Sequence, residues 1–276
     1  MLLISMALTG CLPGSEENKT LINAQPNNQT SVSFERKENR PGTKTVHVFV
    51  ALCDNEYQGI VPVGKAIGNG QDPASNLYWG CDYGLKTYFR RKESDWTLVQ
   101  VQPKLSDTLL ERLLFKHKTL NVYLLADAYN GKFIKPTTID FLDATSGKNA
   151  IEISFRDETL SFGGGANLTA YMGHDGLMDF SIPLRGASSM AAKKETIILA
   201  CYSRKFFSPH IKESGATPIL WTTHLMAPEA YTLHDALREW LANRTNEEIR
   251  LAAARAYAKY QKCSLKAAMN LMVSEW

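Results

Sequence analysis

The chain lacks any run of the roughly 18 to 20 consecutive apolar residues that a membrane-spanning helix needs. It also lacks a segment in which Lys and Arg alternate with aromatic residues, and its formal net charge is only +3. Nucleic-acid binding therefore has no support. Only five cysteines occur, and their wide, irregular spacing matches neither a disulfide framework nor a zinc site.

Motifs of several enzyme classes are missing as well. The glycine-rich stretch SFGGGAN (161–167) is not followed by the Lys-Ser/Thr pair of a phosphate-binding loop, and no Gly-x-Ser-x-Gly nucleophile elbow occurs. His210, His224 and His234 do not have the i, i+4 spacing of a zinc site on a helix. His47 lies within a predicted strand, where it is interpreted as structural. We therefore expect neither a metal ion nor a cofactor.

The N-terminus is a short apolar run, MLLISMALTGC, that ends in Leu8-Thr9-Gly10-Cys11. It resembles a bacterial lipoprotein signal, in which the Cys is lipidated and becomes the mature N-terminus. This resemblance implies a lipid anchor at Cys11 and a location in the cell envelope, at the outer membrane or periplasmic side in a Gram-negative cell. A plain apolar N-terminus is the alternative. Residues 12–44 are rich in Asn, Ser, Thr, Gln, Glu and Pro, which predicts a disordered tether.

Residues 45–276 have the composition of an α/β domain. Strands are predicted at 45–53, 96–102 and 120–129, with helices at 74–91 and 106–118 between them. Such alternation predicts three layers, a mostly parallel sheet with helices on both faces. A helix at 137–145, either a hairpin or a connection at 151–162, and a last strand at 216–223 are expected to follow. The C-terminus is predicted to be helical, with candidate capping boxes at Thr232/Asp235 and Thr245/Glu248.

Two further apolar runs each end in a reactive side chain. The first, GGGANLTAYMGHDG, leads to His174, and the second, ETIILACYS, leads to Cys201. If both are strands of one parallel sheet, their carboxyl ends meet at the edge where α/β proteins bind ligands. A neighbouring imidazole takes the proton of a thiol or stabilises the thiolate, which is the nucleophile. His174 and Cys201 are therefore the predicted catalytic pair.

The blocks AYMGHDG and IILACYS are similar to motifs of cysteine peptidases with the caspase–hemoglobinase fold, a group that includes clostripain, gingipains, legumain, separase and caspases. The GIVPV loop and the segment from Gly215 to Leu241 also resemble parts of that domain. The resemblance implies a polypeptide substrate, Cys201 as the nucleophile that forms a thioester acyl-enzyme, and His174 as general base and acid.

The same resemblance implies the roles of four further residues. The oxyanion hole would use the backbone N–H that follows His174 together with that of Cys201, which places Asp175 and Gly176 at this site. Asp54 and Asp127, at the ends of two predicted strands, are the candidate substrate-binding residues. An acidic pocket there would favour cleavage after Lys or Arg.

Two alternatives remain open at the level of the sequence. Asp175 stands where the peptidases have Gly. A catalytically inactive surface lipoprotein that uses the same fold as a binding module is therefore the second hypothesis. A cysteine transferase or another hydrolase on the same sheet is the third.

Overall fold

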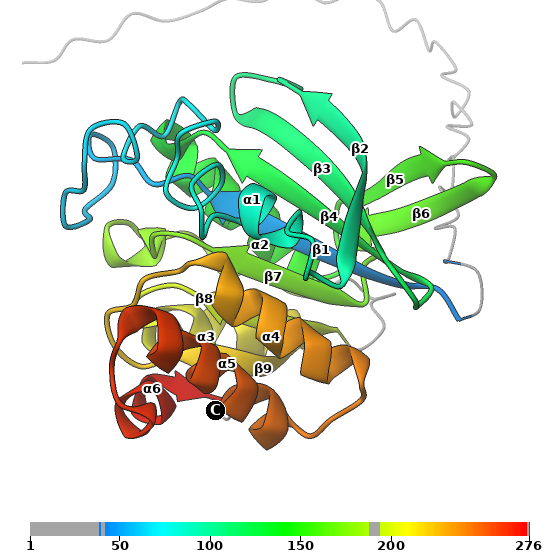
Figure 1. The fold of residues 1–276 in the computed structure, drawn as a ribbon. Coiled ribbons are helices and arrows are strands. Elements are labelled where there is room, and N and C mark those ends of the chain that lie inside the picture. The colour runs from blue at the N-terminus through cyan, green and yellow to red at the C-terminus, as the bar shows by residue number, and fades with distance from the viewer. Residues whose placement is uncertain (1–38, 40–41, 188–193, 275) are drawn as a thin grey trace, which may run out of the picture. The chain divides into compact units, whose positions relative to one another are not determined.

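A mixed β-sheet forms the middle layer of the domain in the computed structural model, which describes residues 39, 42–187, 194–274 and 276. Among those residues the sheet has eight strands, in the order β10-β9-β8-β7-β1-β4-β3-β2 (Figure 1). The fold is α/β with a mostly parallel sheet and C-terminal helices, which confirms the predicted class.

Strands that run parallel to one another occupy the centre of the sheet: β1 (Lys44–Ala51), β4 (Val122–Tyr129), β7 (Leu168–Met172), β8 (Glu195–Leu199) and β9 (Thr217–Thr222). Antiparallel strands close the two edges: β3 (Leu109–His117) and β2 (Trp96–Pro103) next to β4, and β10 (Met272–Val273) next to β9. A separate hairpin, β5 (Ala150–Phe155) and β6 (Glu158–Gly163), packs against β3 and β4.

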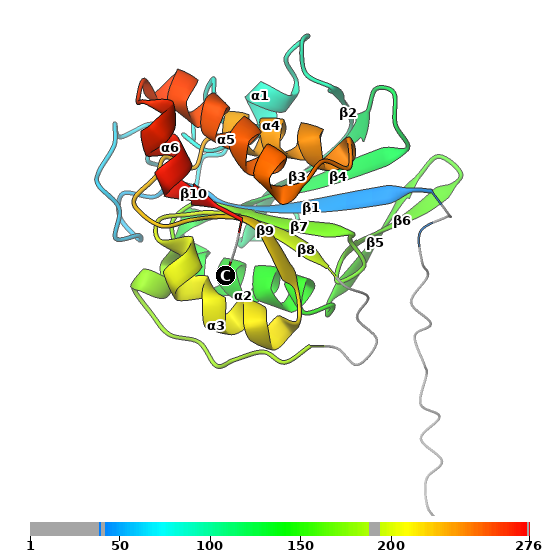
Figure 2. The ribbon, with the colours of Figure 1, turned by 90° about the horizontal axis from the view of Figure 1, so that it is seen from below.

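Helices cover both faces of the sheet (Figure 2). One face carries α1 (Leu85–Phe89), α4 (Ala230–Leu241), α5 (Asn246–Gln261) and α6 (Leu265–Leu271). The other carries α2 (Ile134–Thr145) and α3 (Ser203–Ser214). Short 3₁₀ turns, η1 (Gly131–Phe133) and η2 (Gly176–Met178), follow β4 and β7.

Alternation along β1 supplies both layers of the core. Val46, Val48 and Val50 pack with the helices α4 and α5, whereas Phe49 and Ala51 pack with α2 and α3. Successive side chains of a strand point to opposite faces of the sheet. A strand that is apolar on both faces is therefore stable only where helices cover the sheet on both sides. The register of this central strand therefore fixes the layers above and below it.

Three aromatic rings join α2, β7 and α3 on the second face. The ring of Phe141 lies 5.3 Å from that of Tyr171 and 5.9 Å from that of Phe207, and the last two rings are 5.6 Å apart. All three side chains are fully buried. Because β7 leads directly to His174 and α3 follows Cys201, this cluster holds the two predicted site segments against the same helix.

The segment 106–118 is not the predicted helix: residues 109–117 form the strand β3. Leu113 and Phe115 pack into the core on one face, and Leu114 packs against the β5–β6 hairpin on the other. Since both faces are covered, a dense apolar run suits this strand as well as it suits a helix. The chain between β1 and β4 therefore makes antiparallel strands in place of the expected strand–helix alternation.

The predicted helix at 74–91 is reduced to α1. A Cβ atom at Gly80 or Gly84 would collide with neighbouring backbone, so the chain turns tightly there. The Asn76 side chain accepts from the N–H of Cys53 at 3.1 Å and donates to its carbonyl at 2.8 Å. Those bonds attach the loop to the chain just after β1, and they replace the hydrogen bonds of a regular helix.

Most of the other predicted elements are confirmed, whereas one predicted capping box is wrong. The predicted strands at 96–102, 120–129 and 216–223, the helix at 137–145 and the hairpin at 151–162 are present as β2, β4, β9, α2 and β5–β6. The capping box of Thr245 and Glu248 is confirmed. That of Thr232 and Asp235 is wrong, because α4 begins at Ala230 with Glu229 as its N-cap. Helix α3 and strand β10 were not predicted.

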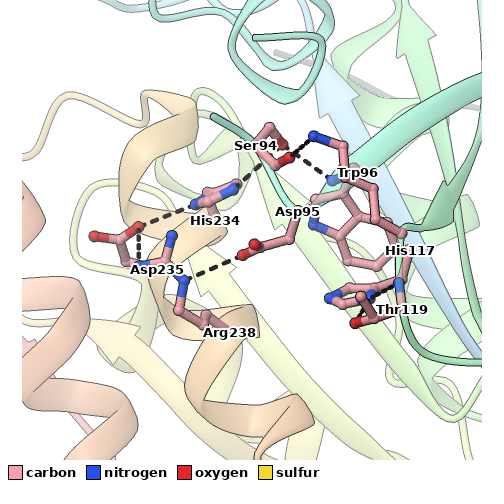
Figure 3. Close-up of polar contacts among 9 residues, drawn as sticks. Ser94, Asp95, Trp96, His117, Thr119, His234, Asp235 and Arg238 are labelled. Atoms are coloured by element: carbon pink, nitrogen blue, oxygen red, sulfur yellow. Dashed lines mark hydrogen bonds and ion pairs between the residues drawn. The ribbon is translucent and has the colours of Figure 1, made fainter. Parts of the chain in front are cut away.

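A polar cluster attaches α4 to the loop before β2 (Figure 3). The His234 ring lies 3.4 Å from Ser94 Oγ and 3.0 Å from Asp235 Oδ1. Arg238 Nε donates to Asp95 Oδ2 at 3.1 Å. These contacts place His234 in the packing of the outer layer, away from the ends of the central strands.

The N-terminal predictions fall on a part of the chain that the structure leaves undescribed. Cys11, the signal-like residues 1–11 and the tether residues 12–38 lie outside the described residues. Within the described residues, no helix is long and apolar enough to cross a membrane.

Candidate active site

The parallel pairing of β7 and β8 brings the two predicted catalytic segments to one edge of the sheet. Met172 lies opposite Leu199 in the strand register, and the Gly173 N–H donates to the Leu199 carbonyl at 3.3 Å. His174 and Cys201 each follow two residues after this pair, so both leave the sheet at the same level. Neighbouring strands are about 4.8 Å apart. The predicted meeting of the two segments is therefore a direct consequence of the register.

Both side chains line one cavity of about 260 Å³ that opens to solvent. The loop after β1 and the loop after β9 form its other walls. The lining residues are Gly59, Ile60, Val61, Val63, Leu77, Tyr78, Gly173, His174, Met178, Cys201, Leu225, Met226, Ala227 and Pro228. Ligand sites of open α/β sheets lie outside the carboxyl ends of the strands, which is where this cavity lies.

His174 is buried and held at two points. The Tyr171 hydroxyl donates to its backbone carbonyl at 2.7 Å. Its ring atom Nε2 lies 2.5 Å from Asp179 Oδ2. Asp179 also accepts from the N–H of Gly59 at 3.4 Å, so it joins the β1 loop to the histidine. A carboxylate on one ring nitrogen fixes the orientation and tautomer of an imidazole.

Asp179 was not among the residues predicted from the sequence. It follows His174 by five positions and lies just after the turn η2, which brings its carboxylate back to the ring. The only signal in the sequence is an Asp soon after the GHDG turn. Asp is so common in turns that this signal alone has little weight.

Cys201 lies in the turn between β8 and α3. Its sulfur is 3.4 Å from the backbone N of Met226 and 3.6 Å from the carbonyl O of the same residue. Burial raises the pKa of the Cys201 thiol, the N–H of Met226 opposes that rise, and the nearby charge of Asp175 adds to it. The Cys201 side chain is therefore held as the thiol, and a thiolate would need a base to take its proton.

The turn that presents Cys201 is tightly held. Tyr202 has φ +49°, in the left-handed region, and its N–H donates to the His224 carbonyl at 3.0 Å. The Ser203 hydroxyl donates to the Ile198 carbonyl at 2.9 Å. A non-glycine residue in this conformation is uncommon and persists where its surroundings fix it.

Asp175, the first of the predicted oxyanion-hole residues, is fully buried. Its Oδ1 accepts the Leu177 N–H at 3.0 Å, whereas Oδ2 has no hydrogen-bond partner among the described residues. Burial raises the pKa of Asp175 to about 8, although the Leu177 N–H acts in the opposite direction. At neutral pH this side chain is therefore mostly a neutral acid, which removes the charge that would oppose an oxyanion.

Gly176, the second of these residues, is needed for packing. A Cβ atom at this position would lie 2.6 Å from Cζ of Phe180 and 2.9 Å from Cγ1 of Ile134. The turn after Asp175 therefore packs too closely against α2 to accept a larger residue.

Asp54 does not line the cavity. It is buried, and its Oδ1 accepts the N–H groups of Glu56 and Tyr57 at 2.9 and 3.1 Å. Its Oδ2 accepts from the Gln71 amide at 2.5 Å. The carboxylate closes the loop that leaves β1, which is the ordinary role of Asp at such a position.

Asp127 lies in a buried ion pair within the sheet, also away from the cavity. Arg112 donates to its two oxygens at 2.7 Å each, and His47 Nε2 lies 3.0 Å from Oδ2. His47 Nδ1 accepts the Gly163 N–H at 3.0 Å, so Nε2 carries the proton. Burial alone would raise the pKa of Asp127, but the hydrogen bonds from Arg112 and the interaction with His47 outweigh it and lower that pKa.

The other three cysteines in the described part of the chain do not line the cavity. Cys53, Cys81 and Cys263 form no disulfide with one another or with Cys201. Burial raises the pKa of the Cys53 thiol to about 11. Among the residues that the structure describes, no group of three or more His, Cys, Asp or Glu side chains could hold a metal ion.

No family model, curated protein or solved structure matches this chain. A functional assignment therefore depends on the geometry of the site.

Proposed function

We propose that the protein is a cysteine hydrolase, and specifically an endopeptidase, with Cys201 as nucleophile and His174 as general base. The observation that supports this most strongly is that both side chains line one open cavity at the carboxyl ends of neighbouring parallel strands. Nucleophilic catalysis uses a thiol and an imidazole that a third group orients, and this cavity is lined by both, with Asp179 on the imidazole.

The reaction would begin with transfer of the Cys201 thiol proton to His174. Because Asp179 occupies Nε2, Nδ1 is the ring nitrogen that receives this proton. The thiolate then adds to the carbonyl carbon of the scissile bond. Backbone N–H groups of Asp175, Gly176 and Cys201 are the proposed donors to the oxyanion, and one such donor is typically worth roughly 3 kcal/mol.

When the tetrahedral intermediate breaks down, the proton taken from Cys201 would pass from His174 to the leaving group. Protonated His174 gives it to the nitrogen of the leaving amine, the C–N bond breaks, and a thioester remains on Cys201. Water, deprotonated by His174, then attacks the thioester and restores the thiol. Asp179 acts as a positioning residue, since it stabilises the imidazolium without touching the substrate.

A non-catalytic binding module is the second candidate function. The burial that raises the pKa of the Cys201 thiol favours it, as does the acidic residue at position 175. A transferase differs from a hydrolase only in the acceptor that attacks the thioester, so product analysis with added amines distinguishes them.

A peptidyl probe with a thiol-reactive acyloxymethyl ketone tests the proposal. We expect the probe to label Cys201, located by peptide mass spectrometry. Labelling should disappear in Cys201→Ala and fall strongly in His174→Ala. Cys263→Ala is a matched control, because Cys263 is also partly buried and lies in the connection between α5 and α6. Equal labelling of wild type and His174→Ala would favour the binding module.

We further propose that the hydrolase is attached to the cell envelope through a lipid on Cys11, with residues 12–44 as a tether. The support is the lipobox-like segment that ends in this Cys. Incorporation of an alkynyl fatty acid into the full chain, lost in Cys11→Ser, is the expected result. Equal incorporation into both would contradict it.

A further inference from the structure

The wall of the cavity includes apolar side chains that solvent reaches. Val61 is 81% exposed, Leu225 61% and Met178 39%, and all three line the cavity that holds His174 and Cys201. They come from three separate segments: the loop after β1, the turn η2, and the loop after β9. Isolated exposed apolar residues are common on protein surfaces, but a convergent group around a cavity marks a binding surface.

The other side chains that line the cavity are mostly apolar as well. Ile60, Val63, Leu77 and Met226 also line the cavity, together with Tyr78 and small residues, and the described lining residues include no Asp, Glu, Lys or Arg. Most of these side chains also pack against the main core, so the walls are fixed by the fold. A cavity of about 260 Å³ is smaller than the roughly 300 to 1,000 Å³ of pockets that enclose a whole small ligand. It suits one side chain with its flanking backbone.

Carboxylates near the cavity are already engaged: Glu229, next to the lining residue Pro228, accepts from the Tyr231 hydroxyl at 2.8 Å and from the Gln261 amide at 2.9 Å. Asp179 contacts the His174 ring and the Gly59 N–H, and Asp175 is fully buried. Asp54 and Asp127 are bound by other groups outside the cavity. A Lys or Arg side chain in the cavity would therefore lose its hydration without gaining an ion pair, which is unfavourable.

We propose that this cavity selects an acyl donor whose side chain next to the reacting carbonyl is apolar, of about the size of Leu or Met. This inference rests on the proposed hydrolase function and names its substrate class. Val61 and Leu225 are the specificity-determining residues at the rim, and Leu77 also lines the cavity. The pocket is then apolar, in place of the acidic pocket that the sequence predicted.

Paired probes that differ only in the residue next to the reactive ketone test the proposal. The rate of Cys201 labelling should be on the order of tenfold or more higher for Leu than for Lys, because apolar pockets discriminate by about this factor. Val61→Asp and Leu225→Asp should lower this Leu/Lys ratio by a similar factor. Both positions are mostly exposed, so these changes leave the core intact.

Leu120→Asp is the matched control. Leu120 is also exposed, but it lies in the turn before β4, at the opposite end of the parallel strands from the cavity. The Leu/Lys labelling ratio of the Leu120→Asp variant should equal that of the wild type. Labelling as fast with Lys as with Leu would overturn the inference while leaving the hydrolase standing. Ratios in Val61→Asp and Leu225→Asp equal to that of the control would overturn the role of the rim. Failure of every probe to label Cys201 would overturn the hydrolase proposal and this inference together.

Discussion

Replacing Asp175 with Asn should stabilise the protein, and the gain should grow as the pH rises. Asp175 is fully buried, and its Oδ2 has no partner among the described residues. Ionising this carboxyl in place costs free energy, because no cation or second donor compensates for the loss of water. Asn has the same shape and keeps an oxygen for the Leu177 N–H, but it never ionises.

The magnitude follows from the change in pKa. The pKa of Asp175 rises from 3.8 to about 8, mainly through burial, and one pKa unit corresponds to about 1.4 kcal/mol. Below 3.8 the carboxyl is protonated in both states. Between 3.8 and about 8 the folded protein binds more protons than the unfolded chain, so the wild type loses about 1.4 kcal/mol of stability per pH unit from this group. At pH 7 the Asn variant should be more stable by about 4 kcal/mol.

Urea unfolding of both proteins between pH 5 and pH 9 measures this difference. We expect the two free energies of unfolding to diverge with rising pH and to run parallel above pH 8. Asp107→Asn is the control, because Asp107 is exposed and its substitution should change stability by less than about 0.5 kcal/mol. A constant difference across the pH range, or a less stable Asn variant at pH 8, would refute the argument from burial.

Two further substitutions probe the ion pair in the sheet and the orientation of the histidine. Asp127→Asn removes the charge that pairs with Arg112 and accepts the His47 hydrogen bond, so it should lower the free energy of unfolding by about 3 to 5 kcal/mol at pH 7. The pKa of Asp127 is lower in the folded protein than in the unfolded chain. Its contribution to stability is therefore present at pH values above the unfolded-state pKa, and it should vanish as the pH falls through the folded-state pKa. Asp179→Ala should slow probe labelling of Cys201 at least tenfold with little loss of stability, since this side chain is 38% exposed; unchanged labelling would remove Asp179 from the site.

The half of the domain that carries the site was largely predictable from the sequence. The strands before His174 and Cys201 are short apolar runs bounded by turn residues, and β9 has the same form. Buried parallel strands have this pattern because both faces are covered. Their order along the chain favours neighbouring positions in the sheet, which places the segments of His174 and Cys201 at the same edge.

The segment between β1 and β4 was not predictable in the same way. Leu109, Leu110, Leu113 and Leu114 repeat at a spacing that one face of a helix shows, yet they lie in strand β3. The decisive partner is the β5–β6 hairpin, which covers the outer face of β3 from more than 30 residues further along the chain. Local periodicity cannot include such a long-range contact, and tertiary packing overrides it.

The site also depends on contacts that spacing does not encode. Asp179 reaches His174 only because the turn η2 reverses the chain, and the apolar rim forms only where the loops after β1 and β9 converge. Asp54 and Asp127, the predicted substrate-binding residues, do not line this cavity. Asp54 lies three residues after β1 and Asp127 lies within β4, and in both places nearby donors bind the carboxylate.

The electrostatic objection raised by Asp175 depends on pH. From the sequence, an acidic residue after His174 places negative charge where an oxyanion would form. In the fold, burial keeps Asp175 mostly neutral below a pKa of about 8, so the repulsion arises only above that pH. There it also raises the pKa of the Cys201 thiol. If Cys201 is the nucleophile, its labelling by a peptidyl probe should therefore lag behind the ordinary rise of thiol reactivity above pH 8, and Asp175→Asn should remove the lag. An identical pH profile in both proteins would show that the Asp175 charge does not reach the reacting atoms.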